Sequence, residues 1–531
     1  MPGILFDQSV PGATTCIVVG PLGDVRDLDF ARYRAVLWWI ETRASKPLPP
    51  GLTATNTQIA PIENAASVDI SGALERFVRL DPRHLPSLII SDALAGALSK
   101  NYDRVISAVH SMLESTHRSR MTRQKDGFTW QKHILRNAPS YVQSRLPDAW
   151  ANALRGLPAI VCGSGPSLDV SINKLVAAAN QAVVFSADSA LRALARHGVA
   201  ADFAVSIDAA KIPEKCLPPD SPPRRVVLAS ISPPGWQDAI SPTRRFFLSG
   251  NQLTDDWLAT FGTPRTAIRA IESCGSTAIE LAAFLGCDPI YLFGLDLAVD
   301  PANPARRHQH DADPGLYGKS NYDPTANLPR VPGNYADTVP CFALGDWREL
   351  DHRLAGRTAP RIFNVNDRGA RLRGTTLVHP EKFFLTAAPG AKDIPLAALP
   401  GTVALPKNPG ALSRLSAAGR TWQEALPGLH RELSQNGPVT LANAFRPLVL
   451  DPEYGRALGA FALKLMPHLV PPIEGDHTFW QTLLGEFEEL AALAAGIENS
   501  IQSARDSRAT GPTIPPPRSH PRPQSPPFRC D

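Results

Sequence analysis

The chain has 531 residues, which is enough for two or three domains with sizeable hydrophobic cores. Its formal net charge of +4 is small for this length, and the lack of a basic stripe with interleaved aromatic residues argues against nucleic-acid binding. Seven scattered cysteines without a CxxC pair argue against a disulfide framework or a zinc ribbon. We find neither a signal peptide nor an apolar run of about 18 residues, and we therefore expect a cytoplasmic protein without a membrane span.

Residues 1–145 predict a small α/β domain with a core of its own. Short apolar runs at residues 16–19 and 35–40 are typical of strands. The apolar spacing over residues 87–98 and 103–115 predicts two amphipathic helices.

Residues 146–385 alternate between predicted strands and helices. Six apolar runs occur in succession, and each ends in Gly, Ser, Asn or Asp: residues 158–162, 182–185, 203–207, 225–230, 246–248 and 289–293. Helices are predicted among them over residues 171–179 and 190–197. The pattern indicates an α/β domain with a mostly parallel, Rossmann-like sheet. Such sheets bind ligands at the carboxyl ends of their strands, so the polar residues are expected to converge at one edge.

The remainder of the chain predicts a helical domain between two segments of different character. Residues 386–410 are rich in Pro, Ala and Gly and are interpreted as a linker. Residues 411–504 carry apolar residues at helical spacing, and we expect the stripe between Phe479 and Leu493 to be core. Residues 505–531 contain repeated prolines and few large apolar residues, so a disordered tail is expected.

A glycine-rich turn follows the first of the six strands. Its residues are Gly163, Ser164, Gly165, Pro166 and Ser167. Glycines let a ligand approach the backbone amides closely, and the amides that open the next helix favour an anion. The turn is therefore a candidate for binding a nucleotide phosphate, although a strand-to-helix turn needs glycine for structural reasons as well.

Further candidates for nucleotide binding lie at other strand ends and at the start of a later helix. Polar side chains follow three of the strands: Asp188, Ser189, Asp208 and Asp296. A second polar cluster opens an almost wholly apolar helix: Ser273, Gly275, Ser276 and Thr277. The amides and hydroxyls of this cluster suit a phosphate or a ribose, and the alternative is an ordinary N-cap on a buried helix.

Four sequence blocks in the central region match a known family in order. They are residues 163–169, residues 187–191 with 201–208, residues 276–278 running to 294–297, and residues 364–374. Together with residues 130–137 they resemble the Maf motility accessory factors, which are flagellin-modifying glycosyltransferases with an MptE-like central domain.

This resemblance implies a fold and an activity. Maf proteins are similar to bacterial sialyltransferases that use CMP-activated nonulosonic acids, so a sialyltransferase-like central domain is expected. The chain would transfer a pseudaminic-, legionaminic- or sialic-type sugar, with inversion, from CMP to serine or threonine hydroxyls of a protein such as flagellin. The resemblance also implies that the glycine turn, Asp188 and the cluster from Ser273 to Thr277 lie near the nucleotide.

The chemistry of such a transfer needs stabilisation of the leaving phosphate and a base for the acceptor hydroxyl. The amides of Ser164, Gly165 and Ser276, with the hydroxyls of Tyr317 and Tyr322, are candidates for the first task. The polar segment after Asp296 also contains two candidate bases, His310, which we favour, and His308, with His352 as the next candidate.

The same segment offers a possible metal site. Asp311 and Asp313 form a DxD pattern, which many glycosyltransferases use to hold a divalent ion on a diphosphate donor. A CMP donor carries a single phosphate, so we expect no required cofactor, and a divalent metal stays an alternative.

Two other functions are compatible with the sequence. Archaeal 6-hydroxymethylpterin diphosphokinases share the first two blocks and would transfer pyrophosphate with magnesium. A non-catalytic accessory or chaperone protein for a secreted filament protein is the third possibility.

Overall fold

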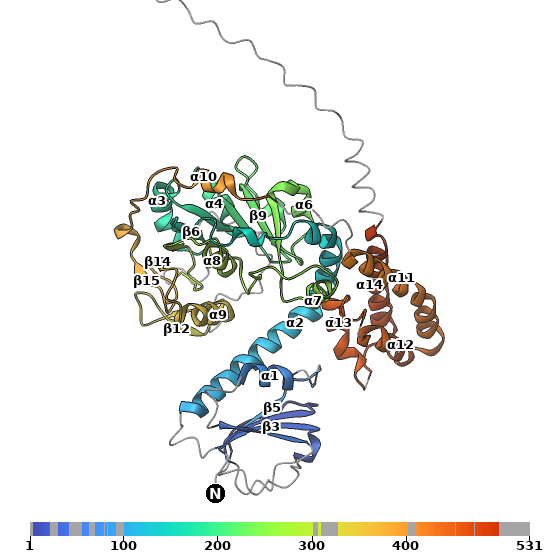
Figure 1. Ribbon diagram of the computed structural model, residues 1–531. Coiled ribbons are helices and arrows are strands. Elements are labelled where there is room, and N and C mark those ends of the chain that lie inside the picture. The colour runs from blue at the N-terminus through green and yellow to red at the C-terminus, as the bar shows by residue number, and fades with distance from the viewer. Residues whose placement is uncertain are drawn as a thin grey trace, which may run out of the picture.

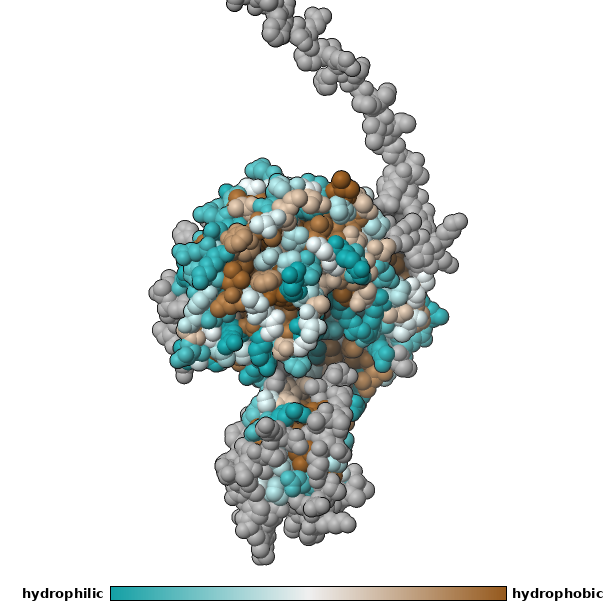
Figure 2. All heavy atoms as spheres, turned by 60° about the vertical axis from the view of Figure 1, so that its left-hand side comes forward, coloured by the Kyte–Doolittle hydropathy of each residue, from teal (hydrophilic) through white to brown (hydrophobic). Residues whose placement is uncertain are grey.

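The chain folds into an N-terminal α/β domain, a central sheet domain and a C-terminal helical domain, as the computed structural model in Figure 1 shows. The structure describes residues 4–21, 30–41, 56–62, 70–78, 80–81, 83–91, 100–300, 306–309, 328–401, 410–451, 453–471 and 473–498. Within these ranges, no helix combines the length and the apolar character needed to cross a membrane. Hydrophilic and hydrophobic residues are mixed over the face of the central domain that Figure 2 shows.

The N-terminal domain is built on a five-stranded sheet with the order β1-β5-β2-β3-β4. The strands are β1 (Ile4–Gln8), β2 (Thr15–Val19), β3 (Ala35–Ile40), β4 (Thr57–Pro61) and β5 (Ser87–Ser91). Only the β1–β5 pair is antiparallel. One face packs against α1 (Ile70–Val78) and the first turns of α2 (Lys100–Gln143).

The predicted helix over residues 87–98 is wrong for its first five residues, which form the buried strand β5. Leu88 and Ile90 join the core beneath the helices, whereas Ile89 joins the core on the opposite face. A strand that is buried on both faces has a continuous apolar run, and periodicity cannot distinguish such a run from a helix. Residues 92–98 lie outside the described part of the chain.

The central domain contains an eight-stranded, fully parallel sheet with the order β10-β9-β8-β7-β6-β11-β14-β15. Six of its strands are those predicted: β6 (Ala159–Cys162), β7 (Val183–Ala187), β8 (Phe203–Ser206), β9 (Arg225–Ala229), β10 (Arg245–Leu248) and β11 (Ile290–Phe293). The sequence did not predict β14 (Ile362–Val365) and the edge strand β15 (Thr376–Val378).

Helices cover both faces of this sheet. One face packs against α3 (Leu168–Ala178) and α4 (Leu191–Arg196), and the other against α8 (Cys274–Phe284) and α9 (Leu344–Ala355). Shorter helices complete the connections: α5 (Pro213–Cys216), α6 (Gly235–Ala239), α7 (Leu253–Thr260) and α10 (Asp393–Ala398). A small hairpin, β12 (Arg330–Pro332) with β13 (Thr338–Pro340), precedes α9. The expected α/β architecture with a mostly parallel, Rossmann-like sheet is therefore confirmed.

The C-terminal domain consists of α11 (Gly410–Arg431), α12 (Pro438–Leu450), α13 (Gly459–Leu465) and α14 (His477–Ala495). The α14 stripe is core as expected, with the Phe487 ring against those of Trp422 and Phe445. Gln131 of α2 joins this domain to the rest, because its side chain donates to the Ala457 carbonyl (2.9 Å) and accepts from the Ala460 amide (2.9 Å). Within the expected linker, α10 buries Leu396 beneath the sheet, and residues 505–531 lie outside the described part.

Candidate functional site

The strand order reverses next to β6, and this reversal creates the site. The chain adds strands outward from β6 to β10 and then returns to place β11 on the other side of β6. Cys162 at the end of β6 is in register with Phe293 at the end of β11, so the two following turns meet. Ligands of open α/β sheets bind at such a switch point. A cavity of about 1200 Å³ lies here, lined by the carboxyl ends of six strands and by parts of α2, α8 and α9.

The turn after β11 packs so closely against the turn after β6 that positions 163 and 165 require glycine. The Gly163 amide donates to the Phe293 carbonyl (2.8 Å), and the Gly165 amide donates to the Gly294 carbonyl (2.7 Å). A Cβ on Gly163 would lie 2.6 Å from the Gly294 oxygen, and one on Gly165 would lie 2.1 Å from Oδ2 of Asp296. Both glycines line the cavity, but the Gly165 amide that we expected to face a leaving phosphate is already used within the protein.

Asp296 holds these two turns together. Its carboxylate accepts hydrogen bonds from the Ser167 amide (2.9 Å) and from Nδ2 of Asn366 (2.8 Å). The residue is buried, and this burial raises the pKa of its carboxyl. Asp296 reaches the cavity wall, whereas Pro166 and Ser167 are buried beside it and do not line the cavity.

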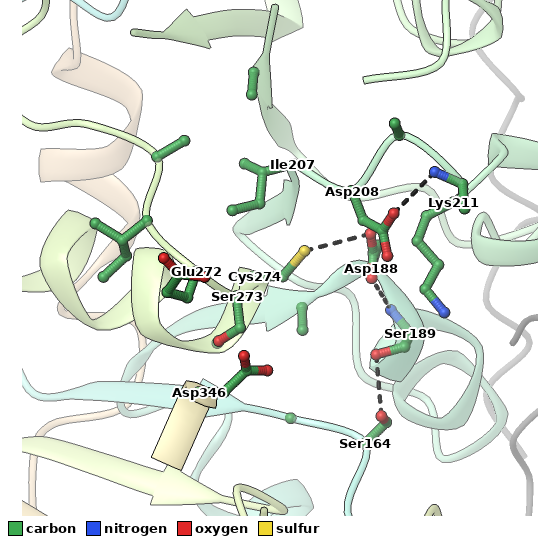
Figure 3. A pocket seen from close by; sticks show the side chains of 18 of the residues that line it. Ser164, Asp188, Ser189, Ile207, Asp208, Lys211, Glu272, Ser273, Cys274 and Asp346 are labelled. Carbon is green, nitrogen blue, oxygen red and sulfur yellow. Dashed lines mark hydrogen bonds between the residues drawn. The ribbon is translucent and has the colours of Figure 1, made fainter. Parts of the chain in front are cut away.

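A chain of hydrogen bonds lies along the cavity from β7 to the segment after β11, and Figure 3 shows its part from Asp188 to Ser164. The Ser189 amide donates to Oδ1 of Asp188 (2.7 Å), and the Ser189 hydroxyl donates to Oγ of Ser164 (3.0 Å). That oxygen is hydrogen-bonded to Nδ1 of His308 (3.3 Å). The residues after β6 and β7 are thereby connected, as their positions after the strands predicted, and His308 joins them from the segment after β11.

Asp188 is the acid in this chain of hydrogen bonds, and it is buried. Its Oδ2 accepts from the Ser206 hydroxyl (2.8 Å) and from the Cys274 thiol (3.5 Å). Burial, with the nearby charge of Asp208, raises the pKa of Asp188 to about 6, and the cation of Lys211 opposes this shift. Asp208 is exposed at the cavity wall, where it accepts from the Ala210 amide (2.8 Å).

The polar start of α8 acts as a helix cap. Oγ of Ser273 accepts from the Ser276 amide (3.1 Å), and the Ser273 hydroxyl donates to Oγ of Ser276 (3.0 Å). The Thr277 hydroxyl oxygen accepts from the Ile271 amide (3.1 Å). The ordinary N-cap is therefore present, and Ser276 and Thr277 are buried behind the cavity wall. Ser273 and Gly275 do line the cavity.

His308 lies over the glycine turn, since the Gln309 amide donates to the Ser164 carbonyl (2.8 Å). Burial, with the cations of Lys211 and Arg307, lowers the pKa of His308 to about 3, so its ring is neutral at neutral pH. His352 is exposed on α9 and does not line the cavity. The remaining candidates of this segment lie outside the described residues: His310, Tyr317, Tyr322, Asp311 and Asp313. The described ranges contain no group of three or more His, Cys, Asp or Glu side chains placed to hold a metal ion.

The cavity contains charged residues that the sequence analysis missed. Lys211 follows β8 in the chain and Arg307 follows β11, Asp346 comes from α9, and α2 contributes Arg123 and Lys125. Burial and the charges of Glu272 and Asp208 raise the pKa of Asp346 to about 6. A sequence signal existed for Lys211, because it follows the strand-end residue Asp208 by three positions. For Asp346 and the α2 residues no local pattern pointed to the site.

Comparison with known proteins finds a match for much of the central domain. Residues 132–301 match the family model described as 6-hydroxymethylpterin diphosphokinase MptE-like. Residues 132–301, which include most strands of the central sheet, are MptE-like. The expected resemblance is therefore confirmed in this region, and the switch-point cavity is formed largely by the MptE-like domain.

The fold of the chain is similar to the solved structure of a Maf glycosyltransferase from Magnetospirillum magneticum AMB-1. The two proteins are 16% identical with a TM-score of 0.54, and the match covers 92% of this chain and 80% of that chain. The likeness therefore extends beyond the MptE-like domain to the flanking domains. No curated protein matches the chain.

Proposed function

We propose that this protein is an inverting glycosyltransferase that moves a nonulosonic sugar from a CMP donor to serine or threonine hydroxyls of a flagellin-like protein. The observation that carries the proposal is the cavity at the switch point, where the turns after β6 and β11 meet the cap of α8. The Maf-like fold supports it, because the solved neighbour is named a glycosyltransferase. The donor requires no further cofactor in this scheme.

The proposed reaction exchanges one bond to the anomeric carbon for another. The bond between the sugar carbon and the phosphate oxygen breaks, and its electron pair stays on the oxygen of the departing CMP. The acceptor oxygen forms the new bond to carbon and gives its proton to a base. Within the described cavity, His308 is the candidate to accept that proton, and His310, which the sequence analysis favoured, lies outside the described residues.

The residues proposed to hold the nucleotide are those that line the cavity near the glycine turn. The hydroxyls of Ser164, Ser189 and Ser273 and the carboxylates of Asp188 and Asp208 offer hydrogen-bond partners for a ribose or a base. Gly163, Gly165 and Gly275 line the same part of the cavity, and a Cβ on any of them would clash with residues 294–296.

A thermal-shift assay with a panel of nucleotides tests the donor class. A ligand that binds only the native protein raises its apparent stability, so CMP should raise the melting temperature more than GTP, ATP or NAD do. Incubation with a CMP-nonulosonic acid and a flagellin-type acceptor should then add the sugar mass to the acceptor. Absence of a shift with CMP contradicts the proposal.

A second candidate function is pyrophosphoryl transfer to a hydroxymethylpterin. The description of the matching family model favours it, because that description names a 6-hydroxymethylpterin diphosphokinase. The same assay separates the two functions, since a shift with ATP and magnesium but none with CMP would support the diphosphokinase. A protein that binds neither nucleotide would support the non-catalytic accessory role.

A further inference from the structure

A second, smaller cavity of about 260 Å³ lies at the amino ends of β9 and β10. Three arginines line it, Arg224, Arg225 and Arg244, together with Thr243 and two residues of α10. Arg225 begins β9, and Ala229 ends it at the switch-point cavity, so the length of β9, about 13 Å, separates the two cavities. A ligand in the smaller cavity would therefore not touch the proposed donor site.

The arginines come from two similar segments that precede neighbouring strands. Both segments have the pattern Ser-Pro-X-Arg-Arg, at residues 221–225 and 241–245. In the parallel pairing of the two strands Arg245 lies opposite Val226, which brings the preceding residues Arg244 and Arg225 together. The two segments therefore lie side by side and supply arginines to one cavity.

Backbone carbonyls hold two of the guanidiniums in place. Nη2 of Arg225 donates to the Leu396 carbonyl of α10 (2.7 Å). Nε of Arg244 donates to the Arg224 carbonyl (3.0 Å), and its Nη2 donates to the Pro223 carbonyl. Among the described residues, Nη1 of Arg225 and Nη1 of Arg244 have no acceptor, and neither atom is buried. Two oriented guanidiniums thus keep N–H groups available to a ligand.

The positive charge at this cavity exceeds the negative charge of its carboxylate partners. Arg224 forms ion pairs with the buried Asp202 (3.4 Å) and with Asp393 (3.3 Å). Within the described part of the chain, Arg225 and Arg244 form no ion pair. Burial lowers the pKa of the Arg225 guanidinium; Asp202 opposes this shift, and the charges of Arg224 and Arg244 add to it. The three cations therefore repel one another, and an anion between them would relieve that repulsion.

The chemistry of the cavity favours a phosphate group over other anions. Guanidinium groups bind phosphate through pairs of parallel N–H···O bonds. A phosphate group has a charge of about −1.5 to −2 at pH 7, which matches the two guanidiniums that lack a carboxylate partner. Its several oxygens accept from more than one guanidinium at a time, whereas a carboxylate has two oxygens and a single charge.

We propose that the cavity formed by Arg224, Arg225 and Arg244 binds the phosphate group of a small soluble anion. The phosphate oxygens accept hydrogen bonds from Nη1 of Arg225 and Nη1 of Arg244. The bound anion connects the segments before β9 and β10 with each other and stabilises this end of the sheet. The site is independent of the proposed glycosyl transfer.

Titration calorimetry of the full chain with inorganic phosphate, at constant ionic strength, tests the site. Arg244→Met removes one of the two guanidiniums without an ion pair and should weaken phosphate binding about 10- to 100-fold, the range for hydrogen bonds to a charged group. The matched control is Arg361→Met, which removes an exposed arginine directly before β14 and should keep the wild-type affinity. Equal phosphate affinities of Arg244→Met and the wild type, or no binding by the wild type, overturn the inference.

A measurement on the wild type locates the ion without any variant. Phosphate should slow hydrogen exchange in peptides that cover residues 221–228 and 241–248, relative to chloride at the same ionic strength. Protection only in residues 163–167 would assign phosphate to the switch-point cavity, and that result, like protection in neither place, overturns the inference.

Acetate is the test of ligand class. It carries one charge and should bind at least about 10-fold more weakly than phosphate, because it forms fewer charge-assisted hydrogen bonds. Acetate that binds as tightly as phosphate would indicate a carboxylate site and contradict the proposed phosphate site.

Discussion

The raised pKa of Asp188 makes a quantitative prediction about stability and pH. The carboxyl is buried, and its pKa is about 6 in the folded protein against an ordinary value of 3.8. A carboxyl whose pKa is higher in the folded than in the unfolded state stabilises the fold at low pH, where it is protonated in both states. This stabilisation is lost as the pH rises through about 6. The difference of about two pKa units makes ionised Asp188 cost about 3 kcal/mol of folding free energy at pH 8. At pH 5 the cost is about 1.5 kcal/mol, because the folded carboxyl is then mostly protonated.

Asp188→Asn removes this titration. The amide alters local hydrogen bonds, for example with the Ser206 hydroxyl, but that change is the same at both pH values. We therefore expect the wild type to gain about 1.5 kcal/mol of stability relative to Asp188→Asn when the pH falls from 8 to 5. Hydrogen exchange of peptides from β7 and β8, followed by mass spectrometry, measures the local opening free energy without interference from the other domains.

The matched control is Asp220→Asn, which removes an exposed carboxylate in the loop before β9. Between pH 8 and pH 5, the opening free energy of β7 and β8 in this variant should change by the same amount as in the wild type. If Asp188→Asn also runs parallel to the wild type, Asp188 ionises normally in the folded protein and the reasoning from its burial is refuted.

Four other predictions concern the site. Asp188→Ala should weaken CMP binding by about 1–3 kcal/mol in calorimetry, the range for an unmade hydrogen bond to a buried group, and normal binding would remove Asp188 from the nucleotide site. Gly165→Ala should lower stability by about 1–3 kcal/mol, because its Cβ would lie 2.1 Å from the Asp296 carboxylate, whereas Gly356→Ala, with open space around it, should change the melting temperature little. His308→Ala should slow transfer by about 10²–10⁴ with CMP affinity near wild type, and full activity of the double variant His308→Ala, His310→Ala would exclude both histidines as the base. Asp346→Asn should remove any fall of the transfer rate below about pH 6 that comes from protonation of this carboxyl, and a pH profile equal to that of the wild type would show that Asp346 does not control the rate.

Much of the central sheet could be predicted from the sequence, because parallel strands buried on both faces have continuous apolar runs. Val183 to Phe185 and Ile290 to Phe293 are examples, and both are strands of the sheet. The same rule failed where strands are less apolar. In β14, Asn364 interrupts the run, and in the edge strand β15 both Thr376 and Leu377 are exposed.

The candidate site was predictable only as far as local chain geometry defines it. Polar residues directly after strands, such as Ser164, Ser189 and Asp208, had to lie at one edge of a parallel sheet, and they do line one cavity. The sequence did not predict which hydrogen bonds each polar group of the site makes. The amides of Gly165 and Ser276 are bonded within the protein, because a neighbouring turn and a capping serine reach them in the folded chain.

The sequence by itself thus determined which segments become strands and which polar residues follow them, since burial and turn chemistry act over a few neighbouring residues. The tertiary structure alone decided that β11 lies beside β6, that Lys211 is buried in the wall of the cavity that Asp188 and His308 also line, and that Asp346 reaches the same cavity from α9. Strand order depends on how whole layers pack, so residues far apart in the chain meet at positions that no local pattern specifies.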